Sequence, residues 1–171
     1  MSRMNPPREA EGLKPVRVLI VDDHPLVRKG LAELILSQPG FEVCGEASGA
    51  AEAIGLVSDA NPDLAIIDLR LRQGTGLELI RQIKARFSHV KMLVSSMQDE
   101  ALFAERVLRA GADGYISKEE ATEKVVEAIR EVMKGKVYLS RRMTEQLLYQ
   151  FAGRTPEPGA DTLDTLSNRE L

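Results

Sequence analysis

The sequence predicts an α/β fold in which a doubly wound parallel sheet is covered by helices on both faces. From Val16 onward, short apolar runs alternate with segments of helical periodicity, and five such strand and helix units follow one another. Glycine, proline and asparagine separate most of these units. The chain has 171 residues, of which 43% are hydrophobic and 29% are charged, so it can form one well-buried domain with a modest extension.

The first two units cover residues 16–57. The apolar run VRVLIV predicts a strand at Val16–Val21, and Pro25 suits the first turn of the following helix because no intrahelical partner exists for an N–H there. Pro39 and Gly40 end this helix, and FEVCGEA predicts a second strand at Phe41–Ala47, followed by a helix of small residues over 50–57. The first helix should face the sheet with Val27, Leu31, Leu34 and Ile35.

The third and fourth units cover residues 61–111. Asn61 and Pro62 form a turn before a third strand at 64–68, and the loop RLRQGTG leads into a third helix. A fourth strand at Lys91–Ser96 precedes a helix over 99–110, which Gly111 ends at the position that favours glycine. The third helix should face the sheet with Leu77, Ile80, Ile83 and Phe87.

The fifth unit consists of a short strand at Gly114–Ser117 and a helix over 122–134, ended by Gly135. Residues 137–152 contain one more helix, expected at 142–151, and residues 153–165 form a flexible linker rich in proline, glycine and acids. Residues 1–14 form a polar, disordered leader to which we assign no function. The inward side chains of the fifth helix are Val125, Ile129, Val132 and Met133.

Composition limits the possible function classes. The one cysteine, Cys44, lies in an apolar strand and is expected to be a small buried side chain, which is typical of cytosolic proteins. No apolar run approaches the length of a membrane span, and the first fifteen residues lack the apolar centre of a secretory signal. A net charge of -3 gives no electrostatic footprint for nucleic acid. We therefore expect a cytoplasmic protein with no membrane contact.

Five polar residues lie at or just after the carboxyl ends of the predicted strands, each following an apolar run: Asp22, Asp23, Asp68, Ser96 and Lys118. Because the carboxyl ends of parallel strands meet at one edge of the sheet, these side chains should share a crevice. Carboxylates repel one another by roughly 4 kcal/mol per pair at about 4 Å and an effective dielectric near 20. A Mg²⁺ ion and the lysine ammonium would offset this repulsion, and Asp68 could then serve as a nucleophile toward phosphorus.

Structural explanations compete at each of these positions. Asp22 or Asp23 alone could be a helix N-cap, but two adjacent residues cannot both cap one helix. Lys118 alone would be an ordinary solvated charge, and its place opposite three acids is what indicates a function. Ser96 is the predicted hydrogen-bond donor, with Ser95 as the alternative, since side chains alternate along a strand.

Two further residues near this edge have more modest interpretations. His24 follows the acid pair, but the only other histidine, His89, is expected at the opposite end of the sheet, so we assign His24 no metal role. Tyr115 lies in the fifth strand, where it either fills the edge of the sheet or takes part in the function.

The segments VLIVDDHPLVRKGL, LAIIDLRLRQGTGLELI, MLVSSM and RAGADGYISK together resemble the receiver domain of bacterial two-component response regulators. The resemblance covers about residues 15–136 and implies a flavodoxin-like sheet of order 2-1-3-4-5. It implies that Asp68 accepts a phosphoryl group from a sensor histidine kinase, and that the chain catalyses only its own phosphorylation and dephosphorylation. By position, Ser96 and Lys118 would contact the phosphoryl group and Tyr115 would switch rotamer. The implied Mg²⁺ ligands are Asp22, Asp23, Asp68 and the backbone carbonyl of Arg70.

The segments GKVYLSRRM and LSNREL resemble regulators with a C-terminal LuxR-type helix-turn-helix. Ser167 and Glu170 have the spacing of a capping box, so residues 166–171 are interpreted as the start of such a domain. The resemblance implies dimerisation on phosphorylation and contact with DNA only through that further domain. Two residues depart from the family pattern: Arg72 replaces a usual proline, and Met97 stands where a small residue is common.

Two other functions remain open on the residues alone. A receiver domain can act as a phosphorylation-independent dimerisation module, although the presence of all five site residues argues against it. A Mg²⁺-dependent phosphatase also uses an aspartyl nucleophile, but its usual signature is D-x-D after the first strand, whereas Asp22 and Asp23 are adjacent. Turnover of a phosphomonoester by the chain would favour the phosphatase.

Overall fold

Five parallel strands form one sheet of order β2-β1-β3-β4-β5 in the computed structural model, which describes residues 12–153. This confirms the predicted doubly wound, flavodoxin-like sheet and its strand order. The order reverses between β1 and β3, so the polar residues after these strands lie at the switch point of the sheet. The strands are β1 Val16–Val21, β2 Phe41–Ala47, β3 Leu64–Ile67, β4 Lys91–Ser96 and β5 Gly114–Ser117.

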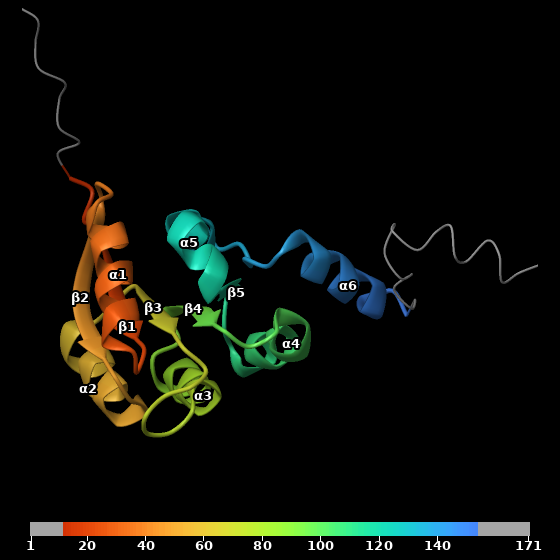
Figure 1. Ribbon diagram of the computed structural model, residues 1–171, viewed down its shortest axis with the longest axis horizontal. Helices are drawn as coiled ribbons and strands as arrows, with labels where there is room; N and C mark the ends of the chain where they lie inside the picture. Colours follow the sequence, from red (N-terminus) through yellow and green to blue (C-terminus); the bar gives the residue numbers. More distant parts are fainter. Residues whose placement is uncertain (1–11, 154–171) are drawn as a thin grey trace, which may run out of the picture.

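Helices cover both faces of the sheet, as Figure 1 shows. Helices α1 (Pro25–Leu36) and α5 (Lys118–Met133) lie on one face. Helices α2 (Ala50–Ala60), α3 (Gly76–Arg86) and α4 (Glu100–Ala110) lie on the other. Two hydrophobic cores result, one between each helical layer and the sheet.

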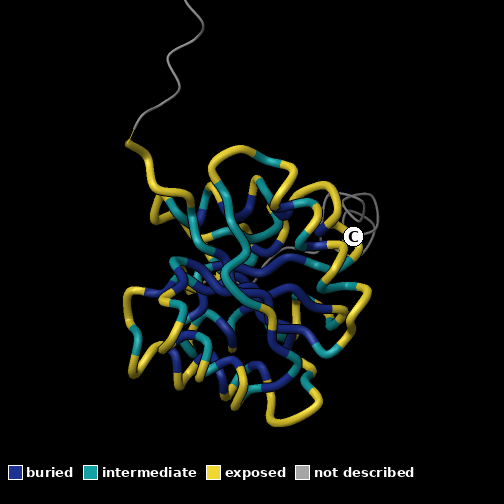
Figure 2. Tube along the Cα trace, turned by 90° about the vertical axis from the view of Figure 1, so that its left-hand side faces the viewer, coloured by how far each residue is buried: buried dark blue, intermediate teal, exposed yellow. Residues whose placement is uncertain are grey.

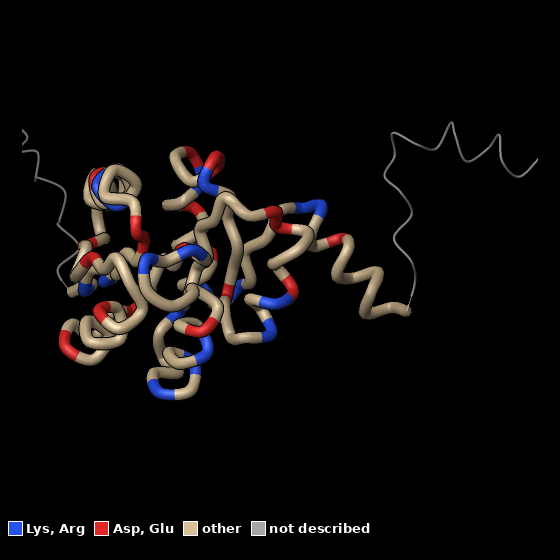
Figure 3. The backbone as a smooth tube through the Cα atoms, turned by 60° about the horizontal axis from the view of Figure 1, so that its bottom comes forward, with Lys and Arg blue, Asp and Glu red and all other residues tan. Residues whose placement is uncertain are grey.

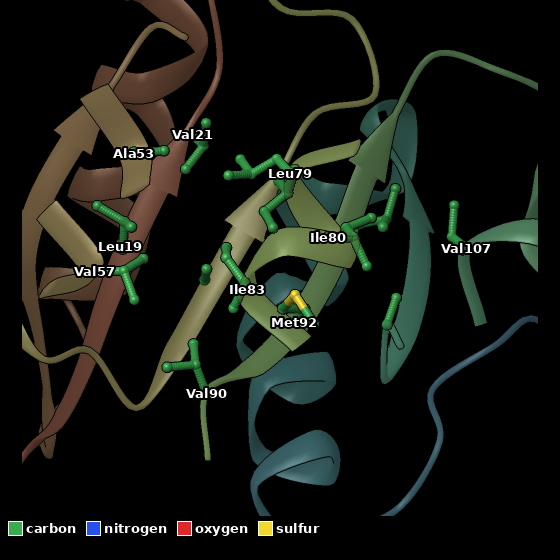
Figure 4. Close-up of a cluster of buried hydrophobic side chains, with 14 of the residues drawn as sticks. Leu19, Val21, Ala53, Val57, Leu79, Ile80, Ile83, Val90, Met92 and Val107 are labelled. Carbon is green, nitrogen blue, oxygen red and sulfur yellow. The ribbon is translucent and has the colours of Figure 1, made fainter. Parts of the chain in front are cut away.

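The central strands supply side chains to both cores, so they are buried while the loops are exposed (Figure 2). Leu19 of β1 faces the core beneath α2, α3 and α4, part of which is drawn in Figure 4. The neighbouring Ile20 faces the core beneath α1 and α5. Because a parallel sheet is covered on both sides, its strands are apolar at nearly every position, as in VRVLIV.

Helix α5 begins at Lys118, four residues earlier than the apolar spacing predicted. Ser117 is its N-cap, since its Oγ accepts a hydrogen bond from the backbone N–H of Glu120 at 3.3 Å. Glu119 and Glu120 add negative charge to the first turn, where the helix dipole favours it. Lys118 is therefore the first helical residue rather than part of a loop.

Helices α2 and α3 also differ in detail from the prediction. Helix α2 continues to Ala60 and ends at Asn61, which adopts a left-handed conformation with a φ of 48°. In α3 the buried stripe includes Leu79, which the spacing argument omitted, whereas Leu77 and Phe87 are only half-buried. Phe87 lies beyond the last helical turn as the C-cap residue, so it cannot continue the stripe.

Cys44 is only half-buried, which corrects the expectation of a buried thiol. Strand β2 is an edge strand, and its register against β1 shifts between Val18 and Leu19, which pair with Val43 and Gly45. Cys44 is the extra residue of this β-bulge, so it has no partner in β1. Burial raises the pKa of its thiol.

A sixth helix, α6 (Arg141–Phe151), follows the sheet and confirms the expected C-terminal helix to within one residue. The connection to it runs beside β5, because Tyr138 pairs with Gly114 and its carbonyl accepts the N–H of Tyr115 at 2.8 Å. Helix α6 then lies beyond the β5 edge, next to α4 (Figure 1). Most of the linker predicted at 153–165 and the domain start predicted at 166–171 fall outside the described residues.

Among the described helices, none has both the length and the apolar character required to cross a lipid bilayer.

Candidate functional site

Lys118 lies between two aspartates at the carboxyl edge of the sheet. Its Nζ is 2.7 Å from Asp68 Oδ2 and 2.8 Å from Asp22 Oδ2. Asp68 follows β3, Asp22 follows β1 and Lys118 begins α5, so three separate elements meet at one ammonium. Both carboxylates are buried, at 4% and 2% exposure. The ends of the strands therefore bring these predicted site residues together.

Neighbouring charges and burial have opposite effects on the pKa values of Asp68 and Lys118. Burial raises the pKa of Asp68 above its ordinary value of 3.8, although the hydrogen bond and charge of Lys118 oppose the shift. Burial lowers the pKa of Lys118, but the hydrogen bonds and charges of Asp22 and Asp68 together outweigh this and raise it. One ammonium thus faces two carboxylates, and the remaining negative charge would favour binding of another cation.

Asp23 supplies the observation that tests whether a metal ion fits. Its Oδ1 is buried and accepts no hydrogen bond from any described residue, although His24 Nδ1 lies 2.8 Å away outside hydrogen-bonding geometry. Asp22, Asp23, His24 and Asp68 each offer a ligand atom within 4.8 Å of the others. A hard divalent cation suits such a set of carboxylate oxygens, so the residues fit Mg²⁺.

The two histidines lie at opposite ends of the sheet. His24 Nδ1 is also 3.1 Å from Asp22 Oδ1, so the side chain lies against the acid pair that it follows in the sequence. His89 Nε2 contacts Asn61 Oδ1 at 3.0 Å, near the starts of β3 and β4. A site with both histidines is therefore ruled out.

Arg70 contacts both Asp68 and the loop after β4. The backbone N–H of Arg70 donates to Asp68 Oδ1 at 3.2 Å. When the Gln98 side-chain amide is oriented with its oxygen toward Arg70, that oxygen accepts from the guanidinium Nε at 2.6 Å and Nη2 at 2.9 Å. Sequence reasoning named only the carbonyl of Arg70, and its role as a ligand stays a prediction.

Ser96 at the end of β4 and Tyr115 of β5 both contact the loop after β4. Ser96 Oγ accepts the backbone N–H of Gln98 at 3.0 Å, and the Tyr115 hydroxyl donates to the Gln98 carbonyl at 2.6 Å. Burial raises the pKa of Tyr115. Ser95, the alternative serine, is equally buried, but its hydroxyl has no hydrogen-bond partner among the described residues. Met97 differs from both, since it is 68% exposed.

Gly76 is a site residue that sequence reasoning treated only as part of a loop. A Cβ at this position would lie 2.2 Å from the carbonyl oxygen of Asp68, so only glycine allows α3 to begin this close to β3. Its N–H donates to the Leu69 carbonyl at 3.0 Å. Thr75 caps the helix just before it, and a Thr-Gly pair at a predicted helix start is the signal that could have identified it.

One known protein family matches most of this chain. The model of the response regulator receiver domain family matches residues 18–130, which contain every residue of the acid cluster. The chain belongs to this family. The sequence resemblance noted above is thereby confirmed.

Related receiver proteins include known regulators of transcription. The transcriptional regulatory protein DegU of Brevibacillus brevis is 32% identical over 136 residues, which cover 80% of this chain and 58% of DegU. The DNA-binding transcriptional activator DevR/DosR of Mycobacterium tuberculosis is 35% identical over 157 residues, covering 91% of this chain and 70% of that protein. The chain thus spans about three fifths to seven tenths of these relatives.

Solved receiver structures have the same fold. The crystal structure of a LuxR-family two-component response regulator from Aurantimonas sp. SI85-9A1 matches with a TM-score of 0.74 and 32% identity, covering 81% of this chain and 99% of that one. The receiver domain of RcsB from Salmonella enterica serovar Typhimurium, with the phosphomimetic BeF3-, matches with a TM-score of 0.69 and 25% identity. That match covers 75% of this chain and 95% of RcsB's domain.

Proposed function

We propose that this receiver domain is a phosphorylation switch that acts in the cytoplasm, with Asp68 as the phosphoacceptor and a sensor histidine kinase as the donor. The observation that supports the proposal best is the contact of Lys118 with both Asp22 and Asp68 at the ends of different strands. The Asp68 carboxylate would attack the phosphorus of a phosphohistidine. The P–N bond breaks as the new O–P bond forms, and the imidazole leaves with a proton from solvent.

Asp22, Asp23, Asp68 and the Arg70 carbonyl are the proposed Mg²⁺ ligands, and this assignment is supported by the buried Oδ1 of Asp23, which accepts no hydrogen bond from a described residue. Bound Mg²⁺ supplies positive charge for the equatorial phosphoryl oxygens. The protein's own contribution is to hold Asp68 in place through the Arg70 N–H and to keep water away by burial.

Lys118 and Ser96 are the proposed partners of the phosphoryl group. The Lys118 ammonium already lies 2.7 Å from an Asp68 oxygen, so it can pair with the negative charge of the phosphoryl group when Asp68 becomes an acyl phosphate. Ser96 Oγ and the Tyr115 hydroxyl both contact the backbone of Gln98. A movement of Ser96 toward the phosphoryl group would therefore disturb the Gln98 carbonyl, and with it Tyr115.

The expected outcome of this switch is dimerisation, with DNA binding through a further domain of the whole protein. Two relatives named above are described as a transcriptional regulatory protein and a DNA-binding transcriptional activator. One solved RcsB structure, at 25% identity, is described as two dimers bound to two parallel DNAs. These descriptions support the proposal by analogy with related proteins.

The test is the intact mass of the protein after incubation with Mg²⁺ and a small acyl phosphate donor. Wild type should gain one phosphoryl group, and Asp68→Asn should gain none. Asp59→Asn, which changes an exposed aspartate of α2, is the matched control and should react like wild type.

Other results would support the rival functions. No adduct on wild type would favour the phosphorylation-independent dimerisation module. Release of many phosphate ions per protein molecule from a phosphomonoester would favour the phosphatase.

A further inference from the structure

Arg28 reaches from helix α1 to the backbone of the acid pair. Its Nη1 donates to the carbonyl oxygen of Asp22 at 2.5 Å, and its Nε lies 3.7 Å from Glu46 Oε1 on β2. The side chain is mostly buried, with 20% of its surface exposed. A cation near the start of a helix opposes the helix dipole, so partners such as these are needed to offset its placement.

The Asp22 carbonyl belongs to the peptide that joins Asp22 to Asp23. Other contacts fix the two sides of Asp22: its N–H donates to the Ala47 carbonyl at 3.0 Å, and its Oδ1 accepts the N–H of His24 at 2.8 Å. Among the described residues, Arg28 alone holds this carbonyl with a side chain. The orientation of this peptide sets where the Asp23 carboxylate points.

We infer that Arg28 is a positioning residue for the divalent cation: by holding the Asp22 carbonyl it aims the carboxylates of Asp22 and Asp23 without contacting the ion. The inference rests on the proposed Mg²⁺ role of this pair. Groups that orient metal ligands in this way commonly change metal affinity about 10-fold to 100-fold when they are replaced.

Because Arg28 is charged, the direction in which its replacement changes the Mg²⁺ affinity tests the inference. A guanidinium near a cation site repels the ion, so if its charge were all that mattered, neutralising it would strengthen Mg²⁺ binding. Loss of the carbonyl contact would instead leave the carboxylates less well aimed and weaken binding. The two explanations therefore predict opposite changes in the Mg²⁺ dissociation constant.

Lys29 provides the matched control. It is the next residue of α1, carries the same charge and is exposed, and it makes no hydrogen bond or ion pair with a residue that the structure describes. Lys29→Gln thus removes one positive charge from the same helix and leaves the Asp22 carbonyl contact intact.

The experiment is calorimetric titration of the full chain with Mg²⁺ in the absence of any phosphodonor. Arg28→Gln should bind Mg²⁺ about tenfold more weakly than wild type, while Lys29→Gln binds equally or slightly more tightly. The phosphorylation rate of Arg28→Gln should return to the wild-type value at saturating Mg²⁺, since the reacting groups are unchanged. Binding by Arg28→Gln as tight as wild type, or tighter, would overturn the inference.

Two additional measurements keep the outcomes separate. If thermal melting shows that Arg28→Gln does not fold, Arg28→Lys is used in its place. Lysine keeps the positive charge but lacks the planar guanidinium that reaches both the Asp22 carbonyl and Glu46. Weaker Mg²⁺ binding by Arg28→Lys supports the inference, and wild-type affinity overturns it. Failure of wild type itself to bind Mg²⁺ would refute the proposed metal site, which is a different result from equal binding by wild type and variant.

Discussion

At the scale of single residues, Ser95 and Ser96 form a natural matched pair. They are adjacent in β4 and equally buried, but of the two hydroxyls only that of Ser96 has a hydrogen-bond partner within residues 12–153. Ser96→Ala should slow phosphorylation about tenfold, as expected for the loss of about 1.5 kcal/mol from a hydrogen bond to a charged group. Intact mass followed over time gives the rate.

Ser95→Ala should leave that rate unchanged and raise the free energy of unfolding by about 1 kcal/mol, because it removes a buried hydroxyl without a partner. Thermal melting of both variants checks this. A slower reaction in Ser95→Ala than in Ser96→Ala would show that the two serines have been assigned the wrong way round.

Asp68 gives a pH prediction whose sign follows from its raised pKa. As the pH falls, the folded protein takes up this proton before the unfolded chain does, so acidification stabilises the fold through this group. At neutral pH the ionised, buried Asp68 is therefore a net cost in the metal-free protein. Asp68→Asn should melt at a higher temperature than wild type there, by about 2–4 °C for each kcal/mol relieved.

The difference in melting temperature should shrink as the pH falls through the raised pKa toward 3.8, because wild type then becomes neutral at this position as well. Scanning calorimetry with a chelator present measures both proteins over this range. A difference that stays constant with pH, or that favours wild type at neutral pH, would contradict the account.

At the scale of whole elements, helix α6 is held to α4 by few contacts. Met143 is buried and Leu147 half-buried, but Phe151 is 91% exposed, and a cavity of about 350 Å³ lies between the two helices. The backbone N–H of Ser140, the N-cap of α6, donates to Glu100 Oε1 at 3.0 Å. Glu100 is the first residue of α4 and follows the Gln98 loop, so this bond connects α6 to the site.

Glu100→Ala should therefore free α6. Loss of about 1 kcal/mol from this bond corresponds to roughly fivefold faster amide hydrogen exchange over residues 141–151. Glu100→Gln keeps an oxygen acceptor and should exchange like wild type, and α5 should be unaffected in both variants. Unchanged exchange over α6 in Glu100→Ala would show that the bond does not hold the helix.

Sequence patterns located every strand and helix of the part of the chain that the structure describes, and the errors occurred where capping decided the boundary. Spacing of apolar residues placed the start of α5 at 122, whereas the Ser117 cap starts it at Lys118. In α3 the same argument chose Leu77 and Phe87 over Leu79, since periodicity alone does not show where a helix stops. The bulge at Cys44 gives no periodic signal, because one extra residue in an edge strand leaves the apolar run intact.

At the scale of the whole molecule, topology explains how much of the site was predictable. Asp22, Asp68 and Lys118 come together because parallel strands end at one edge, which sequence order alone indicates. Contacts made between loops or across elements, such as those of Arg28 and Gln98, depend on side-chain directions that no spacing rule provides. Gly76 is similar, since its need for close approach appears only when α3 is placed against β3.

Charge is spread over the molecule in a way that fits a switch with a local site. Segments with Lys or Arg and segments with Asp or Glu are scattered over the molecule in Figure 3, and the sequence has 23 basic and 26 acidic residues. The charges expected to matter for the switch are therefore those of the buried cluster at the carboxyl edge of the sheet. Its effect on partners is expected to pass through changes in loop and helix position rather than through a surface field.

The central claim is that one carboxylate, Asp68, carries the phosphoryl group. Borohydride reduction of the phosphorylated protein converts an aspartyl phosphate into homoserine, and peptide mass mapping then locates the modified residue. The account predicts homoserine at position 68 alone, and only when Mg²⁺ and the phosphodonor were both present. Homoserine at Asp22, Asp23 or any other acidic residue, or its absence from position 68 in a protein that carries phosphate, would contradict it.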